Sequence, residues 1–257
     1  MLVTLRGGGR IWAVSAIHGN ADRLGALHRA LAPQLKSGDQ LVYLGGYLGY
    51  GPDVLATVNE ILLFRRAFIG QPGGGPDDVA FLRGAQEEMW QKLLQLQFAA
   101  DPVQVLRWML DHGITATLNA YGSTAEEALM AAEDGAVAMT RWTNGLRAAM
   151  RHHDGHTALM SALRHGAMTD DGVLLFVHAG LDPALPLADQ GDRLWWGNPA
   201  FESMDTPYGG FARIVRAHGS VPPGSPPMVT SLGGAPGQPL TAACFAADGQ
   251  VLQTIRV

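Results

Sequence analysis

The chain is organised around the stretch Val42-Tyr43-Leu44-Gly45-Gly46-Tyr47-Leu48-Gly49-Tyr50-Gly51-Pro52-Asp53. Its first three residues form an apolar, β-prone run, which predicts a buried strand. Four glycines follow within seven residues, and glycine permits backbone angles and close approaches that other residues avoid. Pro52 and Asp53 indicate the start of a helix. Such a turn commonly presents a functional group, yet this one has no side chain suited to chemistry.

The composition predicts a single globular domain spanning residues 1–257. Hydrophobic residues make up 47% of the chain and charged residues 16%. The net charge of −5 argues against a nucleic-acid partner bound through a general basic surface. The lone cysteine, Cys244, excludes an intramolecular disulfide and favours a reducing compartment. No apolar stretch approaches the roughly 20 residues of a membrane span, so we expect a cytoplasmic protein.

Hydrophobic periodicity predicts an α/β (α+β) fold of two packed sheets flanked by helices. We expect strands at residues 11–17, 41–44, 79–82, 173–177, 212–217, 228–232, 240–245 and 251–257. Helices are expected after Asn20 and over residues 53–68. A helical insertion is expected at about residues 87–170, between two halves of the sheet structure. The last two strands should form a hairpin about Asp248-Gly249.

Five of the strand-end turns contain glycine, and three place a histidine beside it: His18, His178 and His218. Loops at the carboxyl ends of strands are where such folds build their sites. The five turns are Ala16-Ile17-His18-Gly19, Gly45 to Asp53, Gly84-Ala85-Gln86-Glu87, Val177-His178-Ala179-Gly180 and Ala217-His218-Gly219-Ser220.

The order and spacing of these turns resemble the calcineurin-like metallophosphoesterases. The similarity is to the bacterial serine/threonine protein phosphatase branch, which includes diadenosine tetraphosphatases. That family reads Asp-x-His-Gly, Gly-Asp-x-x-Asp-Arg-Gly, Gly-Asn-His-Glu, His-Ala-Gly and Gly-His-Thr. The resemblance covers nearly the whole chain and implies the family's two-sheet fold.

The resemblance also implies that the metal site is degenerate. In the family, the aspartates of the first two motifs bind two metal ions, and the second aspartate bridges them. The positions of these aspartates are Ala16 and Gly46 here, and the metal-binding asparagine corresponds to Ala85. A two-metal phosphoesterase needs a bridging carboxylate to place its cations about 3.5–4 Å apart, and glycine offers no ligand.

The groups that act on the phosphate are missing as well. The histidine that protonates the leaving group corresponds to Gln86, which does not titrate. The two phosphate-binding arginines correspond to Tyr50 and Gly197. We therefore expect a catalytically inactive metallophosphoesterase-like protein, a pseudophosphatase. It would act by binding a protein partner, as a structural or regulatory subunit.

Two other functions stay open from the sequence. His18, His178 and His218 either bind one divalent metal (Zn, Mn or Fe) in a reduced phosphatase or nucleotide hydrolase, or persist as packed residues. Alternatively, Tyr47, Tyr50 and Gln86 line a pocket for a small ligand or phosphopeptide, although aromatic residues more often fill space.

Three further stretches have plainer interpretations. We expect the histidine-rich stretch His152 to His156 to be solvated rather than metal-binding. Trp195-Trp196 is expected to pack in the core, and Gly73 to Gly75 to be a linker-like loop.

Overall fold

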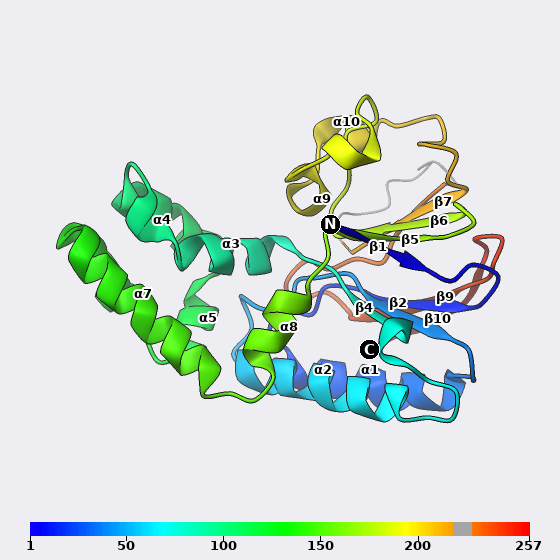
Figure 1. Ribbon diagram of the computed structural model, residues 1–257, viewed down its shortest axis with the longest axis horizontal. Helices are drawn as coiled ribbons and strands as arrows, with labels where there is room; N and C mark the ends of the chain where they lie inside the picture. Colours follow the sequence, from blue (N-terminus) through cyan, green and yellow to red (C-terminus); the bar gives the residue numbers. More distant parts are fainter. Residues whose placement is uncertain (218–227) are drawn as a thin grey trace.

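Two five-stranded sheets lie face to face in the computed structural model, which describes residues 1–217 and 228–257 (Figure 1). One sheet has the strand order β1-β5-β6-β7-β8, and the other has the order β10-β9-β2-β3-β4. The strands are β1 (Leu2–Leu5), β2 (Ile11–Val14), β3 (Gln40–Tyr43), β4 (Val79–Phe81), β5 (Gly166–Thr169), β6 (Leu174–Val177), β7 (Arg213–Arg216), β8 (Val229–Ser231), β9 (Thr241–Phe245) and β10 (Val251–Arg256).

Both sheets mix parallel and antiparallel pairs. In the second sheet β2, β3 and β4 run parallel, while β9 pairs antiparallel with both β2 and β10. In the first sheet β6, β7 and β8 run parallel, and β5 pairs antiparallel with β6. The carboxyl ends of parallel strands meet at one edge, so the turns after β2, β3 and β4 gather together.

In the second sheet β2, β3, β4 and β9 are largely apolar runs because both of their faces are buried, whereas the edge strand β10 is exposed. Along β2, Ile11 and Ala13 join the core between the sheets, whereas Trp12 and Val14 face the helices on the outer side. This alternation follows from the two-residue period of a strand. Phe176 of β6 and Phe245 of β9 meet in the core between the sheets, with ring centroids 6.1 Å apart.

Helices cover the outer faces of both sheets. α1 (Ala21–Leu31) and α2 (Val54–Ile69) lie beneath the second sheet, and α9 (Arg193–Trp196) and α10 (Pro199–Glu202) lie above the first (Figure 1). A helical segment extends to the left of the view, between β4 and β5. It comprises α3 (Ala85–Leu93), α4 (Pro102–Asp111), α5 (Thr115–Ala120), α6 (Ala125–Glu133), α7 (Ala136–Arg151) and α8 (His156–Ala162).

The predicted fold class is confirmed, and so is the hairpin at Asp248-Gly249, where β9 and β10 pair antiparallel. Two strands were missed. β1 is a half-buried edge strand, and β5 contains no apolar run and lies inside the range expected to be the helical insertion. In the described part of the chain, no helix combines the length and apolar character needed to cross a membrane.

Candidate functional site

The glycine-rich turn after β3 has the backbone geometry that its sequence predicts. Gly45, Gly46 and Gly49 adopt φ values of 92°, 72° and 77°, in the left-handed region that favours glycine. The turn also passes close to other backbone: a Cβ atom on Gly45 would lie 2.6 Å from the amide nitrogen of Gly84. Glycine is therefore required at Gly45 both by its φ and by the lack of space.

A buried carboxylate holds this turn in place. Glu87, on the first turn of α3, is only 2% exposed. Its Oε2 accepts hydrogen bonds from the N–H groups of Gly46 (2.8 Å) and Gly84 (2.9 Å), and its Oε1 accepts from Tyr47 (2.8 Å) and Leu48 (3.0 Å). Burial raises the pKa of Glu87, and the four N–H groups oppose that shift. This role of Glu87 was not predicted from the sequence.

The turns after β2, β3 and β6 converge on Gly46. A Cβ atom on Gly46 would lie 2.7 Å from the Cβ of Ala16, 3.3 Å from Cε1 of His178 and 3.4 Å from Cε1 of His18. The structure thus brings together four of the positions singled out in the sequence. It also shows that this space is closed to a side chain on Gly46, because real Cβ atoms do not approach within 2.7 Å of one another.

Gly234, in the loop after β8, packs closely against Ala16 and the backbone of Ala217. A Cβ atom on Gly234 would lie 2.9 Å from the Cβ of Ala16 and 2.6 Å from the carbonyl oxygen of Ala217. Its own carbonyl oxygen accepts a hydrogen bond from Nε2 of His18 at 2.5 Å. The backbone of this loop therefore packs against Ala16, where the resemblance places a metal-binding aspartate.

Two of the three candidate histidines, His18 and His178, lie within the described residues, and they differ in the ring nitrogen that donates to a backbone carbonyl. Nε2 of His18 donates its proton to Gly234, so that nitrogen has no lone pair for a metal. Nδ1 of His178 donates to the carbonyl oxygen of Leu44 at 2.8 Å, the orientation in which a histidine can ligate through Nε2. The third candidate, His218, lies outside the described residues.

A two-metal centre does not fit the residues present. Across residues 1–217 and 228–257, no three His, Cys, Asp or Glu side chains gather in a way that would bind a metal ion. Ala16 and Gly46 stand where the resemblance places the metal-binding carboxylates, and the space between them is closed to a further side chain. A bridged pair of dications needs anionic ligands to offset its repulsion, and none of the described residues supplies one here.

The remaining predicted site residues lie in different environments. Gln86 is buried, and its Nε2 donates to the carbonyl oxygen of His112 at 2.8 Å. Ala85 is the first residue of α3, and Gly197, with φ 81°, ends α9.

Tyr47 and Tyr50 do not share a surface. Tyr47 is wholly buried and its hydroxyl donates to the carbonyl oxygen of Leu82 at 2.8 Å, so it fills the core. Tyr50 is 46% exposed and contacts His18 edge to face, with ring centroids 5.2 Å apart. A ligand could thus reach Tyr50 from solvent but not Tyr47.

A small cleft remains beside the closed site. It has a volume of about 170 Å³ and is lined by residues that include Ala16, His18, Arg23 and Tyr50. Pockets for drug-sized ligands are usually at least about 300 Å³. The guanidinium of Arg23 already donates to the carbonyl oxygen of Gln238 at 2.7 Å. The cleft is therefore suited to a group of only a few atoms.

The histidine-rich stretch is not uniformly solvated, which corrects the sequence-based expectation. His156 is wholly buried: its Nδ1 pairs with the hydroxyl of Tyr121 at 2.9 Å and its Nε2 with Oδ1 of Asn59 at 3.1 Å. Burial, and secondarily the neighbouring His153, lower the pKa of His156 from 6.5 to about 4. His152 is exposed, as expected.

The tryptophan pair is divided between core and surface. Trp195 is buried, as expected, whereas Trp196 is 42% exposed and its ring centroid lies 5.7 Å from that of Trp108. The expectation that both pack in the core is therefore wrong for Trp196.

Comparison with solved structures identifies the fold. A protein assigned as a diadenosine tetraphosphatase matches 99% of this chain and 97% of its own, with a TM-score of 0.57 and 18% identity. The cold-active protein tyrosine phosphatase of a psychrophilic Shewanella matches 98% of this chain and 82% of its own, with a TM-score of 0.50 and 14% identity. A metallophosphoesterase from Sphaerobacter thermophilus matches 96% of this chain and 88% of its own, with a TM-score of only 0.44 and 15% identity.

No protein-family model and no curated protein sequence matches the chain. At identities this low, structural likeness establishes the fold alone. The chain has the calcineurin-like metallophosphoesterase fold, as its strand-end motifs predicted.

Proposed function

We propose that this chain is a catalytically inactive metallophosphoesterase-like protein that acts by binding a protein partner, as a structural or regulatory subunit. The observation that carries the proposal is the closed space at Gly46. Where the family has a bridging aspartate, this chain has a glycine with φ 72°, and a Cβ atom there would lie 2.7 Å from the Cβ of Ala16. An aspartate would meet both backbone strain and a steric clash.

The hydrogen bonds around the turn further support the loss of catalysis. Glu87 keeps the turn in place, but it faces four backbone N–H groups rather than a metal. Gln86 donates to His112, and it stands where the resemblance places the general acid. The scaffold of the site is thus ordered while the groups that would bind metal and phosphate are missing.

Protein binding is supported by a groove between the helical segment and α9. Its volume is about 390 Å³, and we call it the aromatic groove, lined by Met89, Lys92, Gln95, Leu96, Phe98, Ala99, Val105, Trp108, Met109 and Trp196. Phe98 is 82% exposed and Trp108 43% exposed. Exposed aromatic side chains gathered at one place are typical of protein–protein contact surfaces.

Hydrolysis of a generic phosphate ester tests the loss of activity. We expect the chain, supplied with Mn²⁺, Zn²⁺ or Fe²⁺, to turn over p-nitrophenyl phosphate no faster than its His178→Ala variant. Turnover that depends on an added metal and disappears in His178→Ala would overturn the proposal. It would instead support the alternative, a single-metal phosphatase that uses His178.

A pair of surface variants tests the aromatic groove. Phe98→Ser with Trp108→Ser should abolish binding to a protein that co-purifies stoichiometrically with the chain. The control, Val137→Ser with Leu252→Ser, changes exposed apolar residues elsewhere and should retain it. If both pairs bind the partner equally well, this surface is not the binding site. Self-association that the groove variants abolish would identify a second copy of the chain as the occupant.

A further inference from the structure

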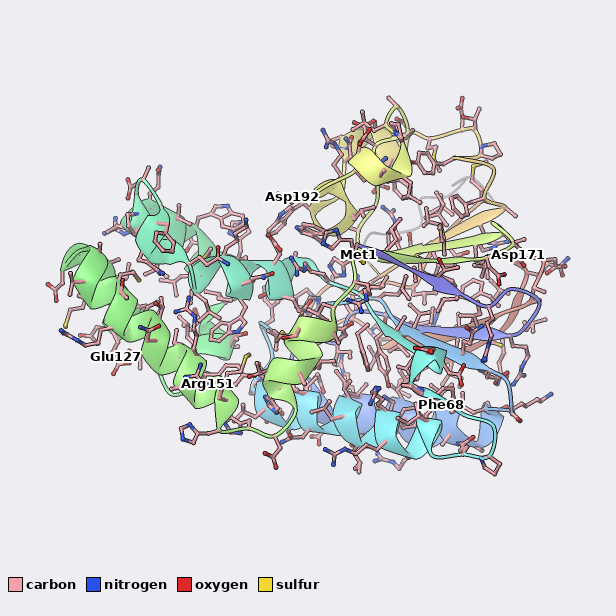
Figure 2. All side chains as sticks on the ribbon, in the orientation of Figure 1. Met1, Phe68, Glu127, Arg151, Asp171 and Asp192 are labelled. Atoms are coloured by element: carbon pink, nitrogen blue, oxygen red, sulfur yellow. The ribbon has the colours of Figure 1, made fainter. Side chains whose placement is uncertain are left out.

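A pocket lies where β1 and β4, which are edge strands of the two sheets, meet α2 and α8. Its volume is about 370 Å³, within the range of pockets that hold small molecules. Figure 2 shows Phe68 on the last turn of α2, below the start of β4, and Arg65 lies about one turn earlier on that helix. None of the described residues that line this pocket belongs to the closed site at Gly46 or to the aromatic groove.

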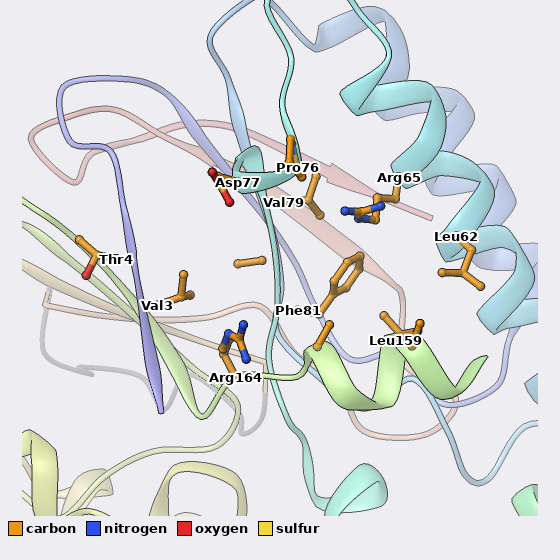
Figure 3. A pocket seen from close by; sticks show the side chains of 13 residues that line it. Val3, Thr4, Leu62, Arg65, Pro76, Asp77, Val79, Phe81, Leu159 and Arg164 are labelled. Atoms are coloured by element: carbon orange, nitrogen blue, oxygen red, sulfur yellow. The ribbon is translucent and has the colours of Figure 1, made fainter. Parts of the chain in front are cut away.

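Two guanidinium groups line the pocket from different elements. Arg65 is on α2, and Arg164 lies between α8 and β5, as Figure 3 shows. The backbone of Arg164 is fixed to the end of β4, because its N–H donates to the carbonyl oxygen of Phe81 at 2.8 Å and its carbonyl oxygen accepts from the N–H of Arg83 at 2.7 Å. Apolar walls are supplied by Leu62, Val79, Phe81 and Leu159. Both charges therefore border an apolar surface.

Neither guanidinium is paired with another group of the chain. Within residues 1–217 and 228–257, Arg65 and Arg164 make no side-chain hydrogen bond and no ion pair, and their side-chain nitrogens stay accessible to solvent although both residues are half-buried. The other half-buried or buried arginines of the described chain all donate to an acceptor: Arg10, Arg23, Arg83, Arg147, Arg193, Arg213 and Arg216. The two exceptions line the same pocket, where a ligand can reach them.

The carboxylate among the described lining residues does not compensate these charges. Asp77 is exposed and forms no ion pair with Arg65 or Arg164. The neighbouring Asp78 is buried and is already paired with Arg6. Partial burial removes some of the water that hydrates a guanidinium, so an anionic acceptor at each group is favourable.

We propose that this pocket binds a small organic dianion, in which two carboxylate or phosphoryl groups are joined by a short apolar body. One anionic group accepts from Arg65 and the other from Arg164, since a guanidinium suits bidentate binding of either group. The apolar body packs against Val79 and Phe81, which lie between the two arginines in Figure 3. An organic monoanion is the poorer match, because it leaves one guanidinium without a partner. The site goes beyond the proposed function and shares no described residue with it.

Titration calorimetry of the full chain with adipate tests the proposal. Hexanoate has the same carbon chain with one carboxylate, and hexanediol has it with none. We expect adipate to bind at least about tenfold more tightly than either, because it alone meets both guanidinium groups. Propylenediphosphonate, which phosphatases cannot hydrolyse, carries two phosphoryl groups on a short apolar body. The dianion that binds more tightly identifies the preferred anionic group.

Variants locate the site. Arg65→Met and Arg164→Met each remove one guanidinium, so each should weaken adipate binding about tenfold and bring it close to that of hexanoate. The matched control is Arg66→Met, which removes an exposed guanidinium on α2 outside the pocket and should leave adipate binding unchanged. Circular dichroism checks that each variant folds. The urea midpoint should not fall in either pocket variant, because neither guanidinium has a partner to lose.

Three results would overturn the proposal. The first is no binding of either dianion at millimolar concentration. The second is adipate binding that is no tighter than hexanoate binding, or that neither Arg65→Met nor Arg164→Met weakens. The third is a lower urea midpoint in both pocket variants but not in Arg66→Met, which would show that the two guanidinium groups already stabilise the folded chain.

Discussion

Oε2 of Glu87 lies 2.8 Å from the amide nitrogen of Gly46, so a buried carboxylate anchors the glycine-rich turn that follows β3. The same side chain accepts three further N–H groups. This arrangement explains how the glycine-rich turn keeps its shape. Its backbone donors are satisfied from within the chain, by a residue that begins the next helix.

Glu87→Gln should destabilise the chain by about 2–4 kcal/mol, because an amide N–H₂ replaces an acceptor among four buried donors. Urea unfolding at neutral pH measures the change as a lower midpoint at an unchanged slope. The control is Glu133→Gln, which removes an exposed carboxylate 4.0 Å from Arg107 and should change stability by less than about 1 kcal/mol. Equal effects of the two substitutions would show that Glu87 does not hold the turn.

Gly46→Ala should cost about 2–5 kcal/mol, from left-handed strain together with the clash at Ala16. Gly122→Ala isolates the strain, because Gly122 has φ 80° but nothing within 4 Å of its Cβ position, and it should cost about 1 kcal/mol. Adding Ala16→Gly to Gly46→Ala removes one side of the clash. A double-mutant cycle should then show a favourable coupling of about 1 kcal/mol or more. Strict additivity would mean that the space at Gly46 is not closed.

Stability should fall as pH drops from 6.5 towards 4, because His156 resists protonation when folded. Its pKa is lowered from 6.5 to about 4 in the folded chain, so the unfolded chain takes up the proton first. The contribution of neutral His156 to the free energy of unfolding is fully present above pH 6.5. Up to about 3 kcal/mol of it is lost by pH 4. His156→Gln should flatten this part of the pH profile, whereas His152→Gln, at an exposed residue, should leave it unchanged. A profile that His156→Gln does not alter would assign the pH dependence to other groups.

Much of the fold follows from local pattern. Runs such as Leu174–Val177 are predictable as strands, because a strand buried on both faces needs a continuous apolar sequence. β5 is not predictable in this way, because Gly166–Thr169 has few large apolar side chains and is buried by the strands and helices around it. β1 alternates weakly at a sheet edge, and so it resembles a loop.

The sequence predicted that the turns carrying Ala16, Gly46 and His178 come together, but it did not predict the contacts that hold them there. The positions of Ala16 and Gly46 were read from motif order alone. The anchoring role of Glu87 had a weak signal, since Gly84 and Glu87 have the three-residue spacing of a capping box at the start of α3. The packing of Gly234 against Ala16 had no signal in the sequence, because it brings together residues far apart in the chain through the backbone of Gly234.

The metal content of the purified chain tests the central claim most directly. The chain would be loaded with excess Mn²⁺ or Zn²⁺, desalted, and measured by elemental analysis beside its His178→Ala variant. We predict far less than one metal ion per chain, with no difference between the two proteins. One or two tightly bound ions per chain, lost in His178→Ala, would contradict a site that the chain has closed.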